Sequence, residues 1–271
     1  MKPLISVLMP AYNAERFIAD AIESILNQTY KNFELIVADD ASTDSTTKIV
    51  KEYCAKDKRV SLISNKKNLY IAANRNKLIK MARGEFIAWA DADDISLPYR
   101  LEEQYKIMMK DKKIGICGGS LEIFGNTRAN GQVRRYPATN KLAKKKIFRY
   151  VTVAQPAAML RSEVFETIGV FDTKTPPAED LNLLFRIGEK YKFANSKKIL
   201  IKYRDNPGSA TYKRLKKIEI TTIKMRIAYF RNKNYNANAG DYFYNIFHFF
   251  SIWLIPPKYK IALFNKLRNS K

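Results

Sequence analysis

Cysteine and histidine are scarce in this chain of 271 residues, which contains two cysteines and one histidine. Cys54 and Cys117 alone can form neither a disulfide framework nor a zinc cluster with four ligands, and so few thiols suit a reducing compartment. We therefore expect a cytoplasmic protein. The single histidine, His248, lies in an aromatic segment near the C-terminus, so a histidine-based mechanism has little support.

Long apolar runs are also missing. The opening MKPLISVLMPAYN has only about five apolar residues before a proline and no small-residue cleavage site after it, so it predicts a buried strand rather than a secretory signal. Residues 242–255 form an apolar and aromatic run, YFYNIFHFFSIWLI, of 14 residues. A helix needs about 20 such residues to span a bilayer, so this run is too short to cross a membrane.

Acidic residues are outnumbered, because 26 Asp and Glu face 49 Lys and Arg and leave a formal net charge of +23. Such an excess attracts nucleic acid, anionic lipid or phosphorylated substrates, and the charge alone does not choose among them. The excess is largest in residues 211–271, where 13 Lys and Arg face only Glu219 and Asp241. We interpret this segment as a basic, aromatic and helical C-terminal extension of a domain that covers residues 1–210.

Short apolar runs alternate with amphipathic segments in the first third of the chain. The apolar runs predict strands at residues 5–9, 33–38, 60–64 and 85–90. The segments with helical spacing predict helices at residues 14–28, 45–55 and 71–81. Beyond residue 115 the alternation weakens, and we expect a strand at 114–123 and a helix at 180–190. The pattern is typical of an α/β fold with a mostly parallel sheet flanked by helices, which binds ligands outside the carboxyl ends of its strands.

Three carboxylates, Asp91, Asp93 and Asp94, follow the fourth predicted strand directly. Hard oxygen ligands at this spacing suit Mg²⁺ or Mn²⁺, particularly when a substrate diphosphate supplies further oxygens. A solvated acidic turn or a helix cap is the ordinary interpretation of an isolated Asp-x-Asp sequence. The polar residues at the neighbouring strand ends favour the metal site instead.

The first two predicted strands end in Pro10-Ala11-Tyr12-Asn13 and in Asp39-Asp40-Ala41-Ser42. An aspartate can accept hydrogen bonds from a base or a ribose, and a tyrosine can cover an aromatic ring. Each cluster alone could be a turn followed by a helix cap. Together with Asn74-Arg75-Asn76, they predict a pocket with base-binding, diphosphate-neutralising and metal-binding parts.

Four ordered blocks resemble glycosyltransferase family 2, a large family of inverting enzymes with the GT-A fold that binds nucleotide sugars. The blocks, which span about residues 4–187, are SVLMPAYN, FELIVADDASTDST, NLYIAANRNKLIKMARGEFIAWADADD followed by LPYRLE, and PAEDLNLLFRI. The resemblance implies nucleotide-sugar binding in about residues 1–115 and an acceptor side in about residues 116–210.

The resemblance also implies roles for single residues. It assigns nucleotide-sugar binding to Pro10, Ala11, Tyr12, Asn13, Asp39, Asp40, Arg75, Asp91 and Ala92, and metal binding to Asp93. It implies that Asp180, beside Glu179, is the catalytic base. A carboxylate near an acceptor hydroxyl can take its proton while a metal stabilises the departing nucleoside diphosphate, and one such displacement inverts the anomeric configuration. Without the other blocks, Glu179 and Asp180 could simply be acidic residues favoured at a helix N-terminus.

Three positions depart from the family pattern. Ala41 stands where glycine is common, and Gln155 precedes a proline where histidine is frequent. The third is the segment after Tyr203-Arg204. In the family, a histidine usually occurs there after one intervening residue, whereas this chain has Asp205-Asn206. Gln155 and Arg204 belong to the expected acceptor side, so these departures concern the identity of the acceptor rather than the class of reaction.

The sequence therefore predicts transfer of a hexosyl or N-acetylhexosaminyl group from a nucleotide-diphosphate sugar, by analogy a UDP sugar. The expected acceptor is a hydroxyl of a saccharide or glycolipid in the synthesis of lipooligosaccharide, capsule or O-antigen. A nucleotidyltransferase is the nearest alternative, but it would need a glycine-rich phosphate loop near the N-terminus, and residues 6–13 contain no glycine. A nucleic-acid-binding protein would combine the charge with 16 Tyr and 15 Phe and would bind oligonucleotides in a salt-dependent way; we expect no such partner.

The aromatic run at residues 242–255 has two interpretations. Its Trp and Tyr residues and basic flanks suit a membrane interface, which would make the protein peripheral at the inner face of the cell membrane, in contact with anionic lipid. Alternatively, the run is a helix that packs its apolar face on the catalytic domain.

Overall fold

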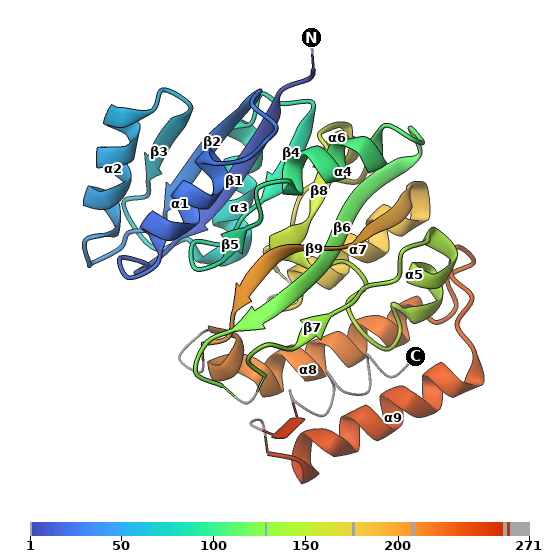
Figure 1. The fold of residues 1–271 in the computed structure, drawn as a ribbon. Coiled ribbons are helices and arrows are strands. Elements are labelled where there is room, and N and C mark those ends of the chain that lie inside the picture. The colour runs from blue at the N-terminus through green and yellow to red at the C-terminus, as the bar shows by residue number, and fades with distance from the viewer. Residues whose placement is uncertain (1, 128, 175–176, 207–209, 257–258, 261–271) are drawn as a thin grey trace.

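The computed structural model describes residues 2–127, 129–174, 177–206, 210–256 and 259–260, which form one sheet of nine strands with helices around it (Figure 1). The strands are β1 (Ile5–Ala11), β2 (Phe33–Asp39), β3 (Val60–Ser64), β4 (Phe86–Trp89), β5 (Ile95–Ser96), β6 (Ile114–Phe124), β7 (Val133–Arg134), β8 (Met159–Arg161) and β9 (Lys192–Arg204). The helices are α1 (Ile18–Leu26), α2 (Thr46–Lys56), α3 (Tyr70–Met81), α4 (Arg100–Met108), α5 (Asn140–Lys146), the 3₁₀ turn η1 (Gln155–Ala157), α6 (Glu163–Ile168), α7 (Glu179–Lys190), α8 (Ala210–Tyr229) and α9 (Ala239–Leu254). The predicted α/β fold is confirmed.

The first four strands pair in parallel in the order β3-β2-β1-β4, as the alternation of strands and helices predicted. Every residue of β1, β2 and β4 is buried. Residues of α1, α2 and α4 pack on one face of these strands and residues of α3 and α7 on the other, which is why the strands read as continuous apolar runs. Helix α1 begins at Ile18 instead of residue 14, because residues 15–17 form a turn whose start is fixed by a hydrogen bond from Ala14 N to Thr46 Oγ1 at 2.8 Å.

The second half of the sheet is mixed. Strand β8 lies antiparallel between β4 and β6, and β9 runs parallel to β6. Strands β5 and β7 pair antiparallel with β9 and β6. The parallel arrangement that we expected therefore holds for the first four strands and for β6 with β9, and the antiparallel pairs make the sheet mixed as a whole.

The carboxyl ends of β1, β2 and β4 meet at one edge of the sheet. Ala11 pairs with Asp39 at the ends of β1 and β2, and Leu8 of β1 pairs with Trp89, the last residue of β4. The polar residues that follow these strands therefore emerge at the same edge, as predicted.

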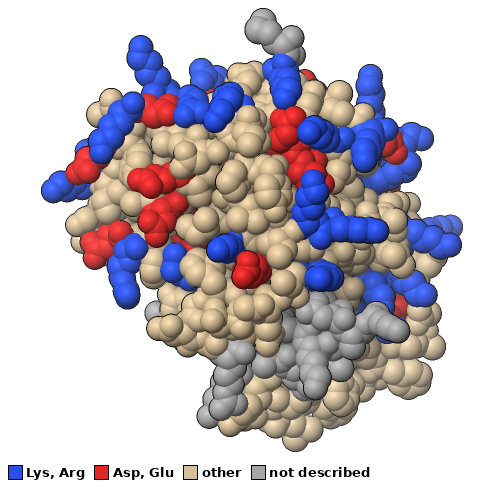
Figure 2. Space-filling model, in the orientation of Figure 1, with Lys and Arg blue, Asp and Glu red and all other residues tan. Residues whose placement is uncertain are grey.

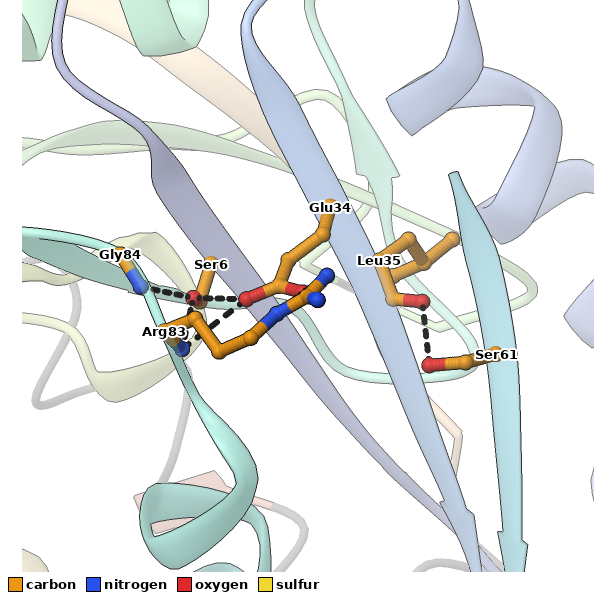
Figure 3. A network of polar contacts seen from close by, with 6 residues as sticks. All are labelled: Ser6, Glu34, Leu35, Ser61, Arg83 and Gly84. Carbon is orange, nitrogen blue, oxygen red and sulfur yellow. Dashed lines mark hydrogen bonds and ion pairs between the residues drawn. The ribbon is translucent and has the colours of Figure 1, made fainter. Parts of the chain in front are cut away.

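At the opposite edge, a polar network fastens the beginnings of β1 and β2 to the loop before β4 (Figure 3). The Glu34 carboxylate accepts hydrogen bonds from Ser6 Oγ at 2.6 Å and from Arg83 Nε at 2.9 Å. Gly84 N donates to Ser6 Oγ at 2.8 Å, and a Cβ on Gly84 would lie 2.6 Å from Ser6 N, so this close approach requires glycine. Burial disfavours the ionised form of Glu34, but the hydrogen bonds from Arg83 and Ser6 outweigh it and lower the pKa of the carboxyl.

We expect Glu34→Gln to lower the free energy of unfolding by about 1–3 kcal/mol at neutral pH, because it removes the charged acceptor of these hydrogen bonds. The pKa of Glu34 is lowered in the folded protein, so its contribution is present above the unfolded pKa and is lost as the pH falls through the folded value. Urea unfolding should therefore show a smaller difference from wild type at acid pH. Glu52→Gln, at an exposed position of α2, is the control. An equal loss at neutral and acid pH would contradict this account.

The C-terminal extension folds against the domain, with α8 and α9 in contact with each other below the sheet in Figure 1. Met225 and Tyr235 are buried in the same hydrophobic core as Phe185 of α7, and the Tyr229 ring stacks on Phe185 with centroids 4.2 Å apart. Among the helices in the described ranges, none is both long and apolar enough to cross a membrane.

Candidate active site

The turn after β4 gathers three carboxylates, and it is closed by a hydrogen bond from Asp94 N to Asp91 O at 3.3 Å. Asp91 and Asp93 are partly exposed, whereas Asp94 is buried. Asp94 Oδ1 accepts a hydrogen bond from Arg204 N at 2.8 Å, and its Oδ2 is buried without a hydrogen-bond partner in the described part of the chain. The turn therefore holds acidic oxygens that its own protein contacts do not all satisfy.

Burial raises the pKa of all three carboxyls of this turn, and that of Asp93 rises to about 6. The charge of Asp91 adds to the shift at Asp93 and at Asp94, while Arg75 opposes the shift at Asp91. A divalent cation would relieve this repulsion, and carboxylate oxygens are the donors that Mg²⁺ and Mn²⁺ prefer, so the residues fit such an ion. Over the described ranges, no group of three or more acidic, histidine or cysteine side chains is arranged to hold a metal ion.

Arg75 of α3 joins this turn to the start of α7. Its Nη1 donates to Glu179 Oε1 at 3.2 Å, and its Nη2 lies 3.8 Å from Asp91 Oδ1. The guanidinium is buried, 5.6 Å from the Trp89 ring centroid and 5.5 Å from that of Phe171. Two aromatic rings and two carboxylates therefore hold the Arg75 guanidinium between α3, β4 and α7.

Asp180 lies beside this ion-pair group at the first turn of α7. It follows Glu179 in the chain, and Arg75 pairs with Glu179 and lies 3.8 Å from Asp91, so Asp180 lies near the carboxylate turn. After burial, its charge also raises the pKa of Asp91. Asp180 is partly exposed and its Oδ1 accepts from Leu181 N at 2.7 Å, whereas Glu179 is buried and paired with Arg75. Burial, and then the charge of Asp180, raises the pKa of Glu179.

Arg204, at the end of β9, is held against the carboxylate turn. Its Nε donates to Asp93 O at 2.9 Å, and its guanidinium lies between two rings, 4.3 Å from the centroid of Phe17 and 4.4 Å from that of Phe124. Together with the backbone hydrogen bond to Asp94, these contacts make Arg204 a support of the turn.

The carboxylates of the two aspartates at the end of β2 accept hydrogen bonds from neighbouring residues. Asp39 is buried and accepts from Thr47 Oγ1 at 2.7 Å and from the amide and hydroxyl of Ser42. Asp40 is also buried, and its Oδ1 accepts from Asn65 Nδ2 at 2.8 Å and from Leu69 N at 2.9 Å. Both carboxylates therefore shape the loops at this edge of the sheet.

The segment after β1 has both supporting and open side chains. Asn13 has a positive φ of 48°, and its Oδ1 accepts from Thr43 N at 2.9 Å. Ala41 also has a positive φ, 61°, a conformation that favours glycine and explains why glycine suits this position. Tyr12 is 52% exposed and remains open to a ligand, while Pro10, Ala11 and Ala92 are buried.

Gln155 begins the turn η1, which contacts both β4 and β6. It is buried, and its Nε2 has no hydrogen-bond partner among the residues that the structure describes. An unpaired buried amide is costly, so this donor suits a polar group supplied by a ligand.

Arg100 is a site residue that the sequence analysis missed. It is fully buried and donates to Trp89 O at 2.5 Å, to Ser96 Oγ at 2.9 Å and to Gln104 Oε1 at 3.1 Å. Burial lowers the pKa of its guanidinium to about 10, while the charges of Asp94 and Asp91 oppose that shift. Arg100 therefore holds the residues on both sides of the carboxylate turn, Trp89 before it and Ser96 after it. In the sequence, the helical spacing of Arg100, Leu101, Gln104 and Met108 was the pattern that could have predicted this buried helix face.

Comparison with known proteins now identifies the family. The family model described as "Glycosyl transferase family 2" matches residues 6–169, which include the strand ends and the carboxylate turn. The chain belongs to glycosyl transferase family 2. This glycosyltransferase is 35% identical over 254 residues to an uncharacterized glycosyltransferase, MJ1057, of Methanocaldococcus jannaschii, covering 92% of this chain and 86% of that one.

Two further proteins are similar to this family 2 glycosyltransferase. The UDP-Glc:alpha-D-GlcNAc-diphosphoundecaprenol beta-1,3-glucosyltransferase WfgD of Escherichia coli is 40% identical over 146 residues, which cover 54% of this chain and 55% of WfgD. The structure of the mannosyltransferase PcManGT from Pyrobaculum calidifontis, in complex with GDP-Man and Mn²⁺, matches with a TM-score of 0.66 at 17% identity. That match covers 99% of this chain and 74% of PcManGT, and it shows the shared GT-A fold.

Proposed function

We propose that this glycosyltransferase moves a hexosyl or N-acetylhexosaminyl group from a UDP sugar to a hydroxyl of a saccharide or glycolipid acceptor, with inversion at the anomeric carbon. The observation that carries the proposal is the convergence of Asp91 and Asp93, Arg75, and Asp180 at one edge of the sheet. The product would be part of a cell-surface glycan such as lipooligosaccharide, capsule or O-antigen.

The donor would lie along the ends of β1, β2 and β4. Tyr12 is exposed and can cover the base, and Arg75 and Asp91 would lie beside the donor. The other residues assigned to the nucleotide sugar would shape the loops around it, namely Pro10, Ala11, Asn13, Asp39, Asp40 and Ala92. A UDP sugar is favoured because UDP-Glc is the donor in the name of WfgD, the relative with 40% identity. The same name contains a lipid-linked saccharide, which supports a glycolipid acceptor.

Asp93 would bind a divalent ion, Mn²⁺ or Mg²⁺, with Asp91 directed to the ribose. When bound, the ion supplies positive charge that stabilises the departing nucleoside diphosphate. Arg204 and Arg100 hold the turn from either side, which fixes the carboxylates before the donor arrives.

Asp180 would act as the base. The acceptor oxygen attacks the anomeric carbon, its proton passes to the Asp180 carboxylate, and the bond to the nucleoside diphosphate breaks with its electron pair on the leaving oxygen. Glu179 is the poorer candidate, because it is buried and its Oε1 already accepts from Arg75. Gln155, with its unpaired Nε2, would face the acceptor side.

A screen of sugar nucleotides tests the proposal. Each UDP and GDP sugar would be assayed for slow hydrolysis and for thermal stabilisation, with and without Mn²⁺. We expect one or a few UDP sugars to stabilise the protein in the presence of Mn²⁺ only. If only GDP sugars stabilised the protein, the donor would be a GDP sugar and not the proposed UDP sugar. If no sugar nucleotide had any effect, the proposal would be contradicted.

A further inference from the structure

Helix α9 has the reverse of the usual amphipathic arrangement. Its buried residues are polar, namely Asp241, Asn245, His248 and Ser251. Its exposed residues are large and apolar or aromatic, namely Tyr242, Phe243, Ile246, Phe247, Phe249, Phe250, Trp253 and Leu254, of which Trp253 is 61% and Leu254 78% exposed. A helix on a water-soluble protein ordinarily buries its apolar side, so this orientation needs a cause.

Polar contacts along the buried side fix the orientation of α9. Asp241 Oδ1 accepts from Arg149 Nε at 2.6 Å, and Asn245 Nδ2 donates to Phe148 O at 2.9 Å. One turn further on, His248 Nε2 lies 3.4 Å from Glu219 Oε1. The spacing of these side chains puts them in one stripe, so rotating the aromatic side inward would break several buried polar contacts at once.

Both acidic residues of the extension, Asp241 and Glu219, are engaged in contacts within the protein. Asp241 is paired with Arg149, and Glu219 accepts from Lys260 Nζ at 2.8 Å in addition to its contact with His248. Because residues 211–271 contain no other Asp or Glu, the outer surface of the extension offers basic groups without carboxylates.

Basic residues accompany the exposed aromatic side chains. Lys216 of α8 is exposed, and its Nζ lies 3.3 Å from the centroid of the Trp253 ring. Lys217 and Lys224 of α8 are also exposed, whereas Arg214 lies over the Tyr70 ring of α3. Helix α9 lies at the bottom of Figure 1, and in the same orientation most of the described residues at the bottom of Figure 2 are neither Lys, Arg, Asp nor Glu. Helix α9 itself contains no Lys or Arg, so the basic groups beside its aromatic side chains come from α8. The two helices together present the aromatic and basic side chains that are typical of a membrane interface.

We propose that α9 binds the protein to the surface of an anionic bilayer, with its exposed aromatic side inserted among the headgroups. The occupant is a bilayer rather than a second copy of this chain, because two copies would bring Lys216, Lys217 and Lys224 of each chain close together at a net charge of +23 each. An anionic surface instead attracts each Lys and Arg near it. This inference does not depend on which sugar is transferred.

Vesicle sedimentation tests the inference with a variant that leaves the fold intact. Phe247→Ser, Phe250→Ser and Trp253→Ser, combined in one chain, remove three exposed rings and none of the buried contacts. We expect the full-length protein to bind vesicles with phosphatidylglycerol at low salt and to bind less as salt rises, and the triple variant to bind at least about tenfold more weakly. Ile71→Ser, Met81→Ser and Met109→Ser, which change three exposed side chains of the catalytic domain, form the control and should bind like wild type.

Two results would overturn the inference. The first is wild-type protein that stays in the supernatant with phosphatidylglycerol vesicles at low salt, or a triple variant that binds as well as wild type. The second is a wild-type dimer in light scattering that the triple variant abolishes, which would put a second copy on α9. The nucleotide-sugar response of the triple variant should equal that of wild type, so a failed proposed function and a failed membrane inference give different results.

Discussion

Replacing Asp180 by asparagine should lower kcat by roughly 10²–10⁴, with the affinity for the donor nearly unchanged. Asparagine keeps the shape of the side chain and its hydrogen bond to Leu181 N but cannot take a proton at neutral pH. The measurement is steady-state transfer with the donor found in the screen, together with calorimetric binding of UDP and Mn²⁺.

Glu179→Gln is the informative companion to this variant. Glu179 is paired with Arg75, which also faces Asp91, so its loss should weaken donor binding and stability more than it slows the chemical step. Near wild-type turnover by Asp180→Asn would reject Asp180 as the base. If Glu179→Gln alone then showed the large fall in kcat with donor affinity intact, the base would be Glu179.

Asp93→Ala should remove the Mn²⁺-dependent part of UDP binding, a loss of about 10²-fold or more. The folded protein without ligand should be no less stable, because the variant removes a partly exposed carboxylate that is already repelled by Asp91. Calorimetry with UDP, with and without Mn²⁺, measures the first effect, and thermal unfolding without ligand measures the second.

Asp20→Ala, an exposed aspartate on α1, is the control for this variant and should leave the metal dependence of UDP binding intact. The assignment of the metal to Asp93 fails if Asp93→Ala retains the full difference between UDP affinities with and without Mn²⁺.

Sequence patterns predicted the first four strands, strand β6 and helix α7 to within about two residues, but they predicted neither β8, β9 nor α4, for a physical reason. Strands β1, β2 and β4 are buried on both faces, so they stand out as apolar runs between polar ends. Strand β8 has only three residues, and β9 contains exposed lysines, so neither has a distinct apolar pattern. Helix α4 was missed because its buried side includes Arg100 and Gln104, which support the carboxylate turn.

The sequence predicted individual residues of the candidate site but not the contacts that bring them together. The polar strand ends could be read from local order, but Asp180 is brought near Asp91 by the Arg75 pairs with Glu179 and Asp91, which no local pattern predicts. The contacts of Arg204 with Phe17 and Phe124, which support the turn, could not be read from the sequence, and its role toward an acceptor stays a prediction. For α9, the alternative that its apolar side packs on the domain is wrong, since the polar stripe packs there.

Tyr235, in the connection between α8 and α9, has a consequence for how the chain unfolds. Its hydroxyl donates to Phe185 O at 2.5 Å, and it lies so close to Gly188 that a Cβ on that glycine would meet the Tyr235 hydroxyl. The extension thereby contributes a buried side chain to the hydrophobic core that contains the buried face of α7. Heating should therefore melt residues 1–210 and the extension in a single calorimetric transition, with equal calorimetric and van't Hoff enthalpies, and not as two independent units.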